Sequence, residues 1–324
     1  MAVVAGLAAS AAGAQALNAG LAPMNVPNPI GGPPMNGVVF YPTTAAAEKA
    51  EIGPYVIDAA QFAPVAPGRF PLVLISHGSG GTRFTHHGLA SHLARQGMLV
   101  AALSHPGDSA FDHLGMDREV VLVARSHQLI ALLDGVLAHP TFAPQVDARR
   151  VGVAGASTGA YTALLAAGGK PDFGRFVEYC STQPRDPLMC KGPPAVPQIR
   201  RGFEARAEPR IKAAVLMAPA LNFLFDRPAL AAVSIPIRLY GAEADEIVPA
   251  PFNAEHIRRS LPKEPEYQLI ERASHYAFIA PCSATLAQGV PEICRDPQGV
   301  DRAAIHHRLN AEIGDFFSRT LGHP

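Results

Sequence analysis

A serine between two glycines is the first feature of this sequence that could do chemistry. Residues 155–159 read Gly-Ala-Ser-Thr-Gly, the pattern G-x-S-x-G, between an apolar run at 151–155 and good helix formers at 157–169. A serine at such a strand-to-helix turn can project its hydroxyl from the carboxyl edge of a sheet and act as a nucleophile. The small neighbours are needed because larger side chains would collide with the adjacent strand or helix. We predict that Ser157 is a catalytic nucleophile; the alternative is a buried, hydrogen-bonded structural serine.

A nucleophilic serine also requires a base and a carboxylate that orients the base, because its hydroxyl is weakly nucleophilic at neutral pH. Among the 13 histidines, His275 lies in a loop directly after a late predicted strand. His256 falls inside a predicted helix, and His306 and His307 fall inside the last one. We therefore predict His275 as the base.

The orienting carboxylate is predicted at Asp245, close after the end of the predicted strand 235–242. Glu243 and Glu246 stand beside it and are the competing choices. This assignment completes a triad of Ser157, Asp245 and His275.

A tetrahedral intermediate carries a negatively charged oxygen that needs two fixed N–H donors. One is expected from Thr158, the residue after the nucleophile, and the other from Ser79 in the glycine-rich loop 77–81. Gly78 and Gly80 let the backbone of this loop approach a substrate closely. We interpret His77 as a residue that shapes the loop rather than as a base.

A second loop, at 104–109, follows the next predicted strand and is expected to line the same site. We predict substrate contacts for Gly78, Gly80, His105 and for Tyr276, which follows the predicted base. The alternative for His105 and Asp108 is that they brace the turn.

Alternating strands and helices must position these residues. Strands are predicted at 37–42, 70–78, 98–105, 149–155, 210–219, 235–242 and 266–273, and helices at 88–97, 117–139, 157–169, 251–261 and 301–321. Continuous apolar strands indicate burial on both faces, and their alternation with helices is typical of parallel sheets. The sequence thus predicts an α/β fold, with a mostly parallel central sheet of about eight strands and helices on both faces.

The two ends of this pattern differ from the rest of the chain. Residues 1–16 are uncharged and rich in alanine, with Ala14-Gln15-Ala16 as a small-x-small cleavage pattern, so we predict a signal peptide there and one domain at 17–324. The alternative is a frayed, alanine-rich N-terminus. Inside the domain, segment 168–209 has no clean periodicity, and a connection this long is often a lid, although a surface insertion that only packs is the competing interpretation.

The four cysteines form two local pairs along the chain. Cys180 and Cys190 bracket one proline-containing loop, and Cys282 and Cys294 bracket another, without the C-x2-C spacing of a zinc site. Disulfides persist in oxidising compartments, so two such bridges fit a periplasmic or secreted protein. Four unpaired buried thiols are the alternative.

The composition excludes several classes of function. The 27 Lys and Arg balance 27 Asp and Glu, and Trp is absent, which argues against nucleic acid as a partner. The glycines of loop 77–81 lack the Lys-Ser/Thr of a phosphate-binding loop. Within each of the pairs His86-His87 and His306-His307, the two side chains point to different helix faces, so no metal is expected. No cofactor and no membrane span are predicted for the body of the chain.

Five stretches together resemble a known superfamily: LVLISHGSGG, ALSHPGDS, GASTG, DEIVP and ASHYAF, which run from residue 72 to residue 278. They are similar to the α/β-hydrolases, and specifically to predicted dienelactone hydrolases related to platelet-activating-factor acetylhydrolase. Dienelactone hydrolases proper use a cysteine nucleophile, whereas this chain has Ser157, so the resemblance implies serine ester hydrolysis.

The combined prediction is an exported serine hydrolase that acts on small-molecule carboxylic esters, of short acyl chain if segment 168–209 restricts the pocket. Three alternatives use the same triad: an acyltransferase, a hydrolase of polyesters or lipids, and a serine peptidase. The peptidases with this triad order usually carry a large N-terminal domain, for which this chain has no room. A binding-only relative would lack a triad member, and all three are present.

Overall fold

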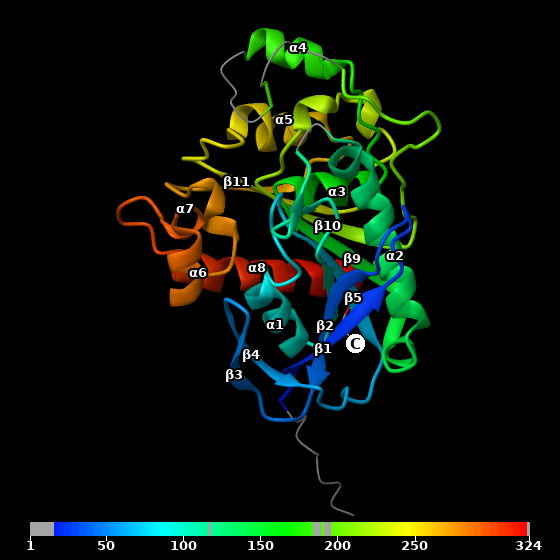
Figure 1. The fold of residues 1–324 in the computed structure, drawn as a ribbon, viewed down its shortest axis with the longest axis vertical. Helices are drawn as coiled ribbons and strands as arrows, with labels where there is room; N and C mark the ends of the chain where they lie inside the picture. The colour runs from blue at the N-terminus through cyan, green and yellow to red at the C-terminus, as the bar shows by residue number, and fades with distance from the viewer. Residues whose placement is uncertain (1–15, 116–117, 184–188, 191–195, 323–324) are drawn as a thin grey trace, which may run out of the picture.

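The computed structural model describes residues 16–115, 118–183, 189–190 and 196–322. Within them one large sheet holds ten strands in the order β12-β11-β10-β9-β5-β6-β2-β1-β4-β3, with helices packed against it (Figure 1). The strands of this sheet are β1 (Asn18–Val26), β2 (Met35–Thr43), β3 (Glu48–Ile52), β4 (Tyr55–Gln61), β5 (Phe70–Ser76), β6 (Leu99–Leu103), β9 (Val146–Ala156), β10 (Ile211–Met217), β11 (Ile237–Ala242) and β12 (Glu266–Ile270).

Six neighbouring strands, from β12 to β6, run parallel to one another. Every residue of β5 and β6 is buried, as the continuous apolar runs predict for strands covered on both faces. Because these strands are parallel, their carboxyl ends meet at one edge of the sheet, where the loops after β5, β9, β11 and β12 converge.

The remaining four strands extend the sheet beyond β6. Strand β2 pairs antiparallel with both β6 and β1, and β4 pairs parallel with β1. The predicted fold class is confirmed, but the expected number of about eight strands is too low. Strands β1, β3 and β4 were not predicted, because Pro23 interrupts β1, β3 has no buried residue, and exposed residues alternate irregularly with buried ones in β4.

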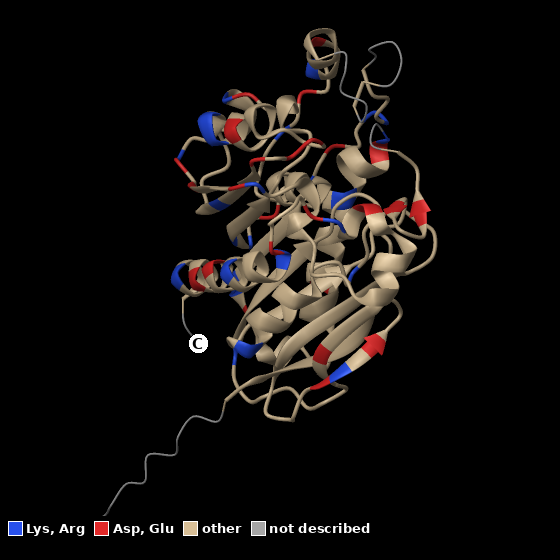
Figure 2. Cartoon of the chain, turned by 90° about the vertical axis from the view of Figure 1, so that its left-hand side faces the viewer, with Lys and Arg blue, Asp and Glu red and all other residues tan. Residues whose placement is uncertain are grey.

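Helices cover both faces of the sheet. On one face α1 (His87–Arg95) packs against α8 (Arg302–Leu321), and on the other α2 (Arg125–Ala138) packs against α3 (Thr158–Ala166). Helix α5 (Ala254–Ser260) lies beside β11. Acidic and basic residues are interspersed along the chain, as expected from the balanced composition (Figure 2).

The predicted helix at 117–139 begins in the structure with a π-helical turn, η1 (Val120–Ala124), that continues into α2. Among the described residues one helix, Val120–Ala138, is long and apolar enough to cross a membrane, and 67% of its apolar window is buried inside the protein. The same helix packs against β6 and α3.

Both predicted cysteine pairs are disulfides, with Cα atoms 5.3 Å apart for Cys180–Cys190 and 5.8 Å apart for Cys282–Cys294. Cys180 lies in α4 (Arg175–Thr182), within segment 168–209. Residues 184–188 and 191–195 of that segment, and residues 1–15 of the predicted signal peptide, lie outside the described residues.

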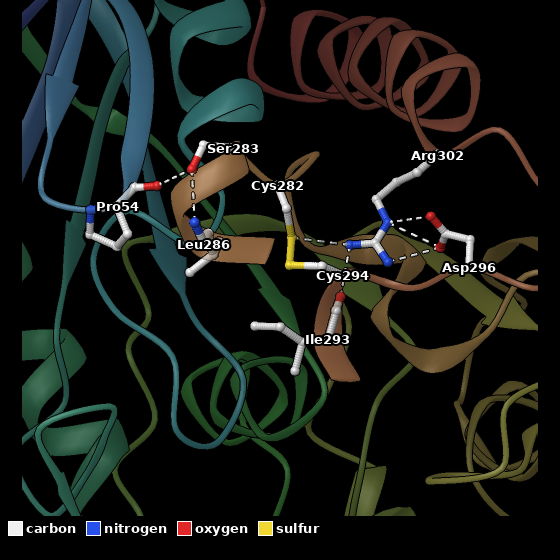
Figure 3. The surroundings of a disulfide bond; sticks show 8 residues. All are labelled: Pro54, Cys282, Ser283, Leu286, Ile293, Cys294, Asp296 and Arg302. Carbon is white, nitrogen blue, oxygen red and sulfur yellow. Dashed lines mark hydrogen bonds and ion pairs between the residues drawn. A yellow bond between two sulfur atoms is a disulfide. The ribbon is translucent and has the colours of Figure 1, made fainter. Parts of the chain in front are cut away.

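The second disulfide joins the start of α6 (Ala284–Gly289) to the end of α7 (Pro291–Cys294), directly after the turn that holds His275 (Figure 3). Buried Arg302 of α8 donates to Asp296 and, over 2.9 Å, to the carbonyl of Ile293. On the other side the Ser283 hydroxyl donates to the carbonyl of Pro54. The disulfide-closed segment is thus fixed to α8 and to the turn between β3 and β4.

Candidate active site

Ser157 stands at the sharp turn between β9 and α3. Its backbone has φ 54° and ψ −122°, a left-handed conformation that is costly for a residue with a side chain. Backbone hydrogen bonds to the end of β10 and the residues after it hold the turn. The Ser157 amide donates to the carbonyl of Met217 over 2.9 Å, and the Ser157 carbonyl accepts the amide of Ala220 over 3.2 Å. Backbone strain of this kind persists only where the surrounding structure imposes it, and such strained residues are concentrated at functional sites.

The two glycines of the motif are required by space. A Cβ on Gly155 would lie 2.2 Å from the backbone of Gly159, and a Cβ on Gly159 would lie 1.9 Å from the carbonyl oxygen of Ser76. Real atoms do not approach this closely, so strand, turn and helix could not pack as they do. The predicted collision of larger neighbours is confirmed at both positions.

His275 and Asp245 come together from the loops after β12 and β11. The His275 Nδ1–H donates to Asp245 Oδ2 over 2.9 Å, and the side chains are 9% and 1% exposed. The other oxygen of Asp245 accepts the amides of Ile247 (3.0 Å) and Val248 (2.8 Å), which fixes the carboxylate.

The competing carboxylates are placed differently. Glu243 is exposed and accepts the amide of Arg272 over 2.7 Å, and Glu246 is exposed as well. Of the three acidic residues at 243–246, Asp245 is therefore the one that contacts His275.

The loop 77–81 passes directly beside Ser157. A Cβ on Gly78 would lie 3.3 Å from the Ser157 Cβ, so the backbone of the loop approaches the predicted nucleophile closely. The Ser79 amide makes no backbone hydrogen bond among the described residues, and Thr158 begins α3. Ser79 therefore follows directly after the glycine that approaches Ser157, and Thr158 is the first residue of α3, so the predicted oxyanion hole stays a prediction that this arrangement permits.

The interpretation of His77 as a residue that shapes its loop fits the geometry. His77 is buried, its Nε2 accepts the amide of His105 over 3.0 Å, and its Nδ1 therefore donates to the carbonyl of Gly78 over 2.6 Å. Burial and the nearby Arg125 guanidinium hold the pKa of His77 well below its usual range, so the ring stays neutral.

The predicted substrate contacts have different outcomes. His105 is fully buried and both ring nitrogens are engaged, with Ser76 and with Gln128, each at 2.8 Å. The His105 side chain has no exposed surface that a substrate could contact. The predicted substrate contact of His105 is therefore wrong, and this residue braces the turn, which was the alternative. Gly78 is half-buried, Gly80 is exposed, and Tyr276 packs edge-on against the His275 ring at 5.4 Å.

Of the four histidines at 86–87 and 306–307, His86 and His306 are buried, His87 is half-buried and His307 is exposed. His306 Nε2–H donates over 3.0 Å to the carbonyl of Ala277 in the turn that holds His275, η6 (His275–Phe278). Burial lowers the pKa of His86 to about 3, and the pKa values of His87 and His306 to about 4. These three histidines are therefore neutral, and His306 supports the turn.

One buried charge near the site was not foreseen from the sequence. Arg125 of α2 is fully buried and donates to Thr158, to the carbonyl of His77 and to Asp108. The available signal was an arginine in the first half of the strongly apolar helix Val120–Ala138, whose other formally charged residue is Asp134, and burial of such a helix implies a paired guanidinium.

The comparisons with known proteins concern the fold and one part of the sequence. Residues 45–120 match the family model described as platelet-activating factor acetylhydrolase, isoform II, and that region includes β5 and loop 77–81. A solved structure, the ferulic acid esterase from Streptomyces cinnamoneus, superposes with a TM-score of 0.62 at 22% sequence identity, over 96% of this chain and 92% of that chain. No curated protein matches the chain in sequence. An acetylhydrolase family and an esterase structure thus share features with this chain, which has the α/β-hydrolase fold.

Proposed function

We propose that this protein is a serine-dependent carboxylic ester hydrolase with Ser157 as nucleophile, His275 as base and Asp245 as orienting acid. The observation that carries the proposal is the buried hydrogen bond from His275 to Asp245 at the same sheet edge as the strained Ser157 turn. The likeness to an acetylhydrolase family and to an esterase structure supports the same reaction class.

The proton steps follow from the tautomer that Asp245 imposes. Because Nδ1–H of His275 donates to Asp245, its Nε2 is left with a free lone pair that accepts the Ser157 proton as the serine oxygen attacks the ester carbonyl. The same Nε2–H then protonates the leaving alcohol, and an acyl-enzyme forms at Ser157. Water, deprotonated by His275, releases the acid and restores the serine.

The proposed oxyanion hole consists of the Ser79 and Thr158 amides. In the tetrahedral intermediate the carbonyl oxygen carries a full charge, and fixed donors stabilise that charge more than they stabilise the uncharged ester. Thr158 is held by α3, and the loop 77–81 places Ser79.

Hydrolysis of p-nitrophenyl acetate by the wild type and by Ser157→Ala tests the proposal. We expect kcat to fall by about 10⁴-fold or more in Ser157→Ala and in His275→Ala, and the double variant to be little worse, because the groups act as a unit. His307→Ala is the matched control, since this histidine is exposed on α8 and lies away from the triad. Equal turnover by wild type and Ser157→Ala would refute the proposal. Adding an alcohol acceptor to the assay separates hydrolysis from acyl transfer.

We further propose that substrates are small or short-chain esters. Helix α4 turns its apolar face inward, where Phe176 and Tyr179 are buried against Phe223, with Tyr179 stacked on Phe223 at 3.8 Å. Phe223 follows closely after Ala220, whose amide binds the Ser157 carbonyl. A packed cover of this kind restricts a pocket, whereas a docking groove for lipids or polymers would present these side chains to solvent.

A series of p-nitrophenyl esters from acetate to palmitate, with a polyester film, checks this preference. We expect the highest kcat/KM from acetate to butyrate, and a flatter profile when part of the loop between Cys180 and Cys190 is deleted. Faster hydrolysis of palmitate or of the film than of butyrate would instead identify segment 168–209 as a docking surface.

A periplasmic or extracellular location is also proposed, and the two disulfides support it, because such bonds persist in oxidising compartments. Fractionation of cells that express the full chain tests this, with mass determination of the N-terminus to show whether cleavage follows Ala16.

A further inference from the structure

Arg125 connects the two halves of the proposed oxyanion hole. From α2 its guanidinium donates to the Thr158 hydroxyl over 3.0 Å and to the carbonyl of His77. It also donates to the Ser76 hydroxyl over 3.0 Å and to the carboxylate of Asp108. One side chain therefore contacts the residue after the nucleophile, the end of β5 and the first residue of loop 77–81.

Asp108 extends this network to the other side of the loop. Its second oxygen accepts the hydroxyl of Ser79 over 2.5 Å, and the same hydroxyl lies 2.7 Å from His113 Nε2. Asp108 and His113 belong to the hairpin of β7 (Asp108–Ser109) and β8 (Asp112–His113). The Ala110 amide of this hairpin donates to the Gly81 carbonyl over 3.0 Å. The side chain of Ser79 and the far end of its loop are thus both held by the hairpin.

The ion pair between Arg125 and Asp108 is completely buried. Arg125 and Asp108 are both 0% exposed. Burial lowers the pKa of Arg125, and the carboxylate of Asp108 beside it opposes that shift. A buried ion pair is often no more stabilising than apolar residues of similar volume, so packing alone does not explain its presence. The side chains of Arg125 and Asp108 donate to or accept from Ser76, His77, Ser79 and Thr158, which belong to the elements and the loop next to Ser157.

We propose that Arg125 and Asp108 are positioning residues that fix the Ser79 and Thr158 amides at the spacing required by the oxyanion of the reaction proposed above. Arg125 orients the Thr158 side through its hydroxyl and the start of the loop through His77. Asp108 orients the Ser79 side through the Ser79 hydroxyl. The inference rests on the proposed esterase function and adds to it residues that contact neither substrate nor nucleophile.

Ser79→Ala is the central test, because it keeps the amide donor and removes only the hydroxyl that Asp108 holds. Loss of a whole oxyanion donor costs about 10²- to 10³-fold in kcat, so a donor that is present but less well held should cost about 10-fold. KM for p-nitrophenyl acetate should stay within about twofold, since the interaction is made in the transition state. Ser109→Ala is the matched control: its hydroxyl is buried in the same hairpin and accepts the Phe111 amide, without contact to Ser79.

Asp108→Asn tests the other end of the network. It leaves a buried, uncompensated guanidinium and should lower kcat by about 10- to 100-fold as well as Tm. The double variant Ser79→Ala/Asp108→Asn should have the kcat of Asp108→Asn, because both changes interrupt one path. Where Asp108→Asn does not fold, Ser79→Ala alone decides the question.

A boronic acid that adds to Ser157 separates positioning from general stability. Its affinity should fall by the same factor as kcat in Ser79→Ala, because its tetrahedral adduct occupies the oxyanion hole. The inference is overturned if Ser79→Ala keeps the kcat and boronate affinity of Ser109→Ala, or if it changes only Tm. If instead the wild type is inactive, or Ser157→Ala is fully active, the proposed function itself fails.

Discussion

Asp245 and its two acidic neighbours differ in burial, and burial determines which of them can orient a base. Asp245 is buried with three hydrogen bonds to its carboxylate, whereas Glu243 and Glu246 face solvent. An exposed carboxylate shares its interaction with water and holds an imidazole weakly.

Replacing Asp245 by Asn should lower kcat by about 10⁴-fold, because the amide no longer selects the tautomer with a free Nε2 on His275. Glu243→Gln and Glu246→Gln are the isosteric controls and should retain kcat within about twofold. Steady-state kinetics on p-nitrophenyl acetate gives the comparison. Loss of activity in a glutamine variant together with retention in Asp245→Asn would move the acid assignment.

The residues of the proposed triad could be picked out from the sequence because each follows within a few residues of a predicted strand. Arg125 was not, since its partners Asp108 and Ser76 lie 17 and 49 residues away along the chain and belong to other elements. The role of His105 could not be predicted from the sequence either. Its position in a loop indicates proximity to the site, but only the hydrogen bond between its ring and Gln128 shows that it braces the turn.

At the scale of elements, the disulfide-closed segment of α6 and α7 supports the His275 turn. It follows that turn in sequence and is joined to α8 through Arg302. The Ala280 amide between them donates to Thr85 over 3.1 Å.

The double variant Cys282→Ala/Cys294→Ala should lower stability by about 2 to 3 kcal/mol, because the bridge closes a short loop and restricts the unfolded chain. In thermal unfolding we expect a drop in Tm of a few degrees, about 2 to 6 °C for a chain of this size. Cys180→Ala/Cys190→Ala serves as the comparison, since it removes a bridge of similar loop length in a different segment, 168–209. If both variants lose activity equally at 25 °C, the segment after His275 has no special role in supporting the base.

Burial explains why some strands were predicted and others were missed. Strands β5 and β6 are recognisable from the sequence by their unbroken apolar runs, whereas β3, with the sequence EKAEI, has no buried residue and exists because β4 pairs with it. The antiparallel direction of β2 also depends on its partners, β1 and β6, and cannot be derived from its own residues.

For the whole molecule, neutral buried histidines predict a steep loss of stability in mild acid. The pKa values of His86, His87 and His306 are about 3, 4 and 4 in the folded protein, below the ordinary value of 6.5. Between pH 6.5 and about 4 the unfolded chain therefore binds protons that the folded chain does not, and stability falls as pH falls, by up to about 1.4 kcal/mol per histidine and pH unit. Above pH 6.5 this contribution is constant.

Chemical denaturation between pH 7.5 and pH 5 measures this slope. His306→Gln should reduce it, because one buried proton-binding group is gone, and His307→Gln is the neighbouring exposed control that should leave it unchanged. A wild-type stability that is flat over this range would contradict the buried, neutral state of these histidines.

The order of the strands in the sheet also determines which residue of the proposed triad is displaced first when the protein partly unfolds. Ser157 follows β9 in the interior of the sheet, Asp245 follows β11, and His275 follows β12, which is an edge strand with one fully buried residue, Ile270. Edge strands fray before central ones, so a sheet that has released β12 still presents the Ser157 turn but has lost the proposed base. We expect such a molecule to be folded by most physical measures and catalytically inactive. Under the proposed mechanism, catalytic turnover reports on the attachment of a single outer strand, and a nascent chain stays inactive until its last strand is in place.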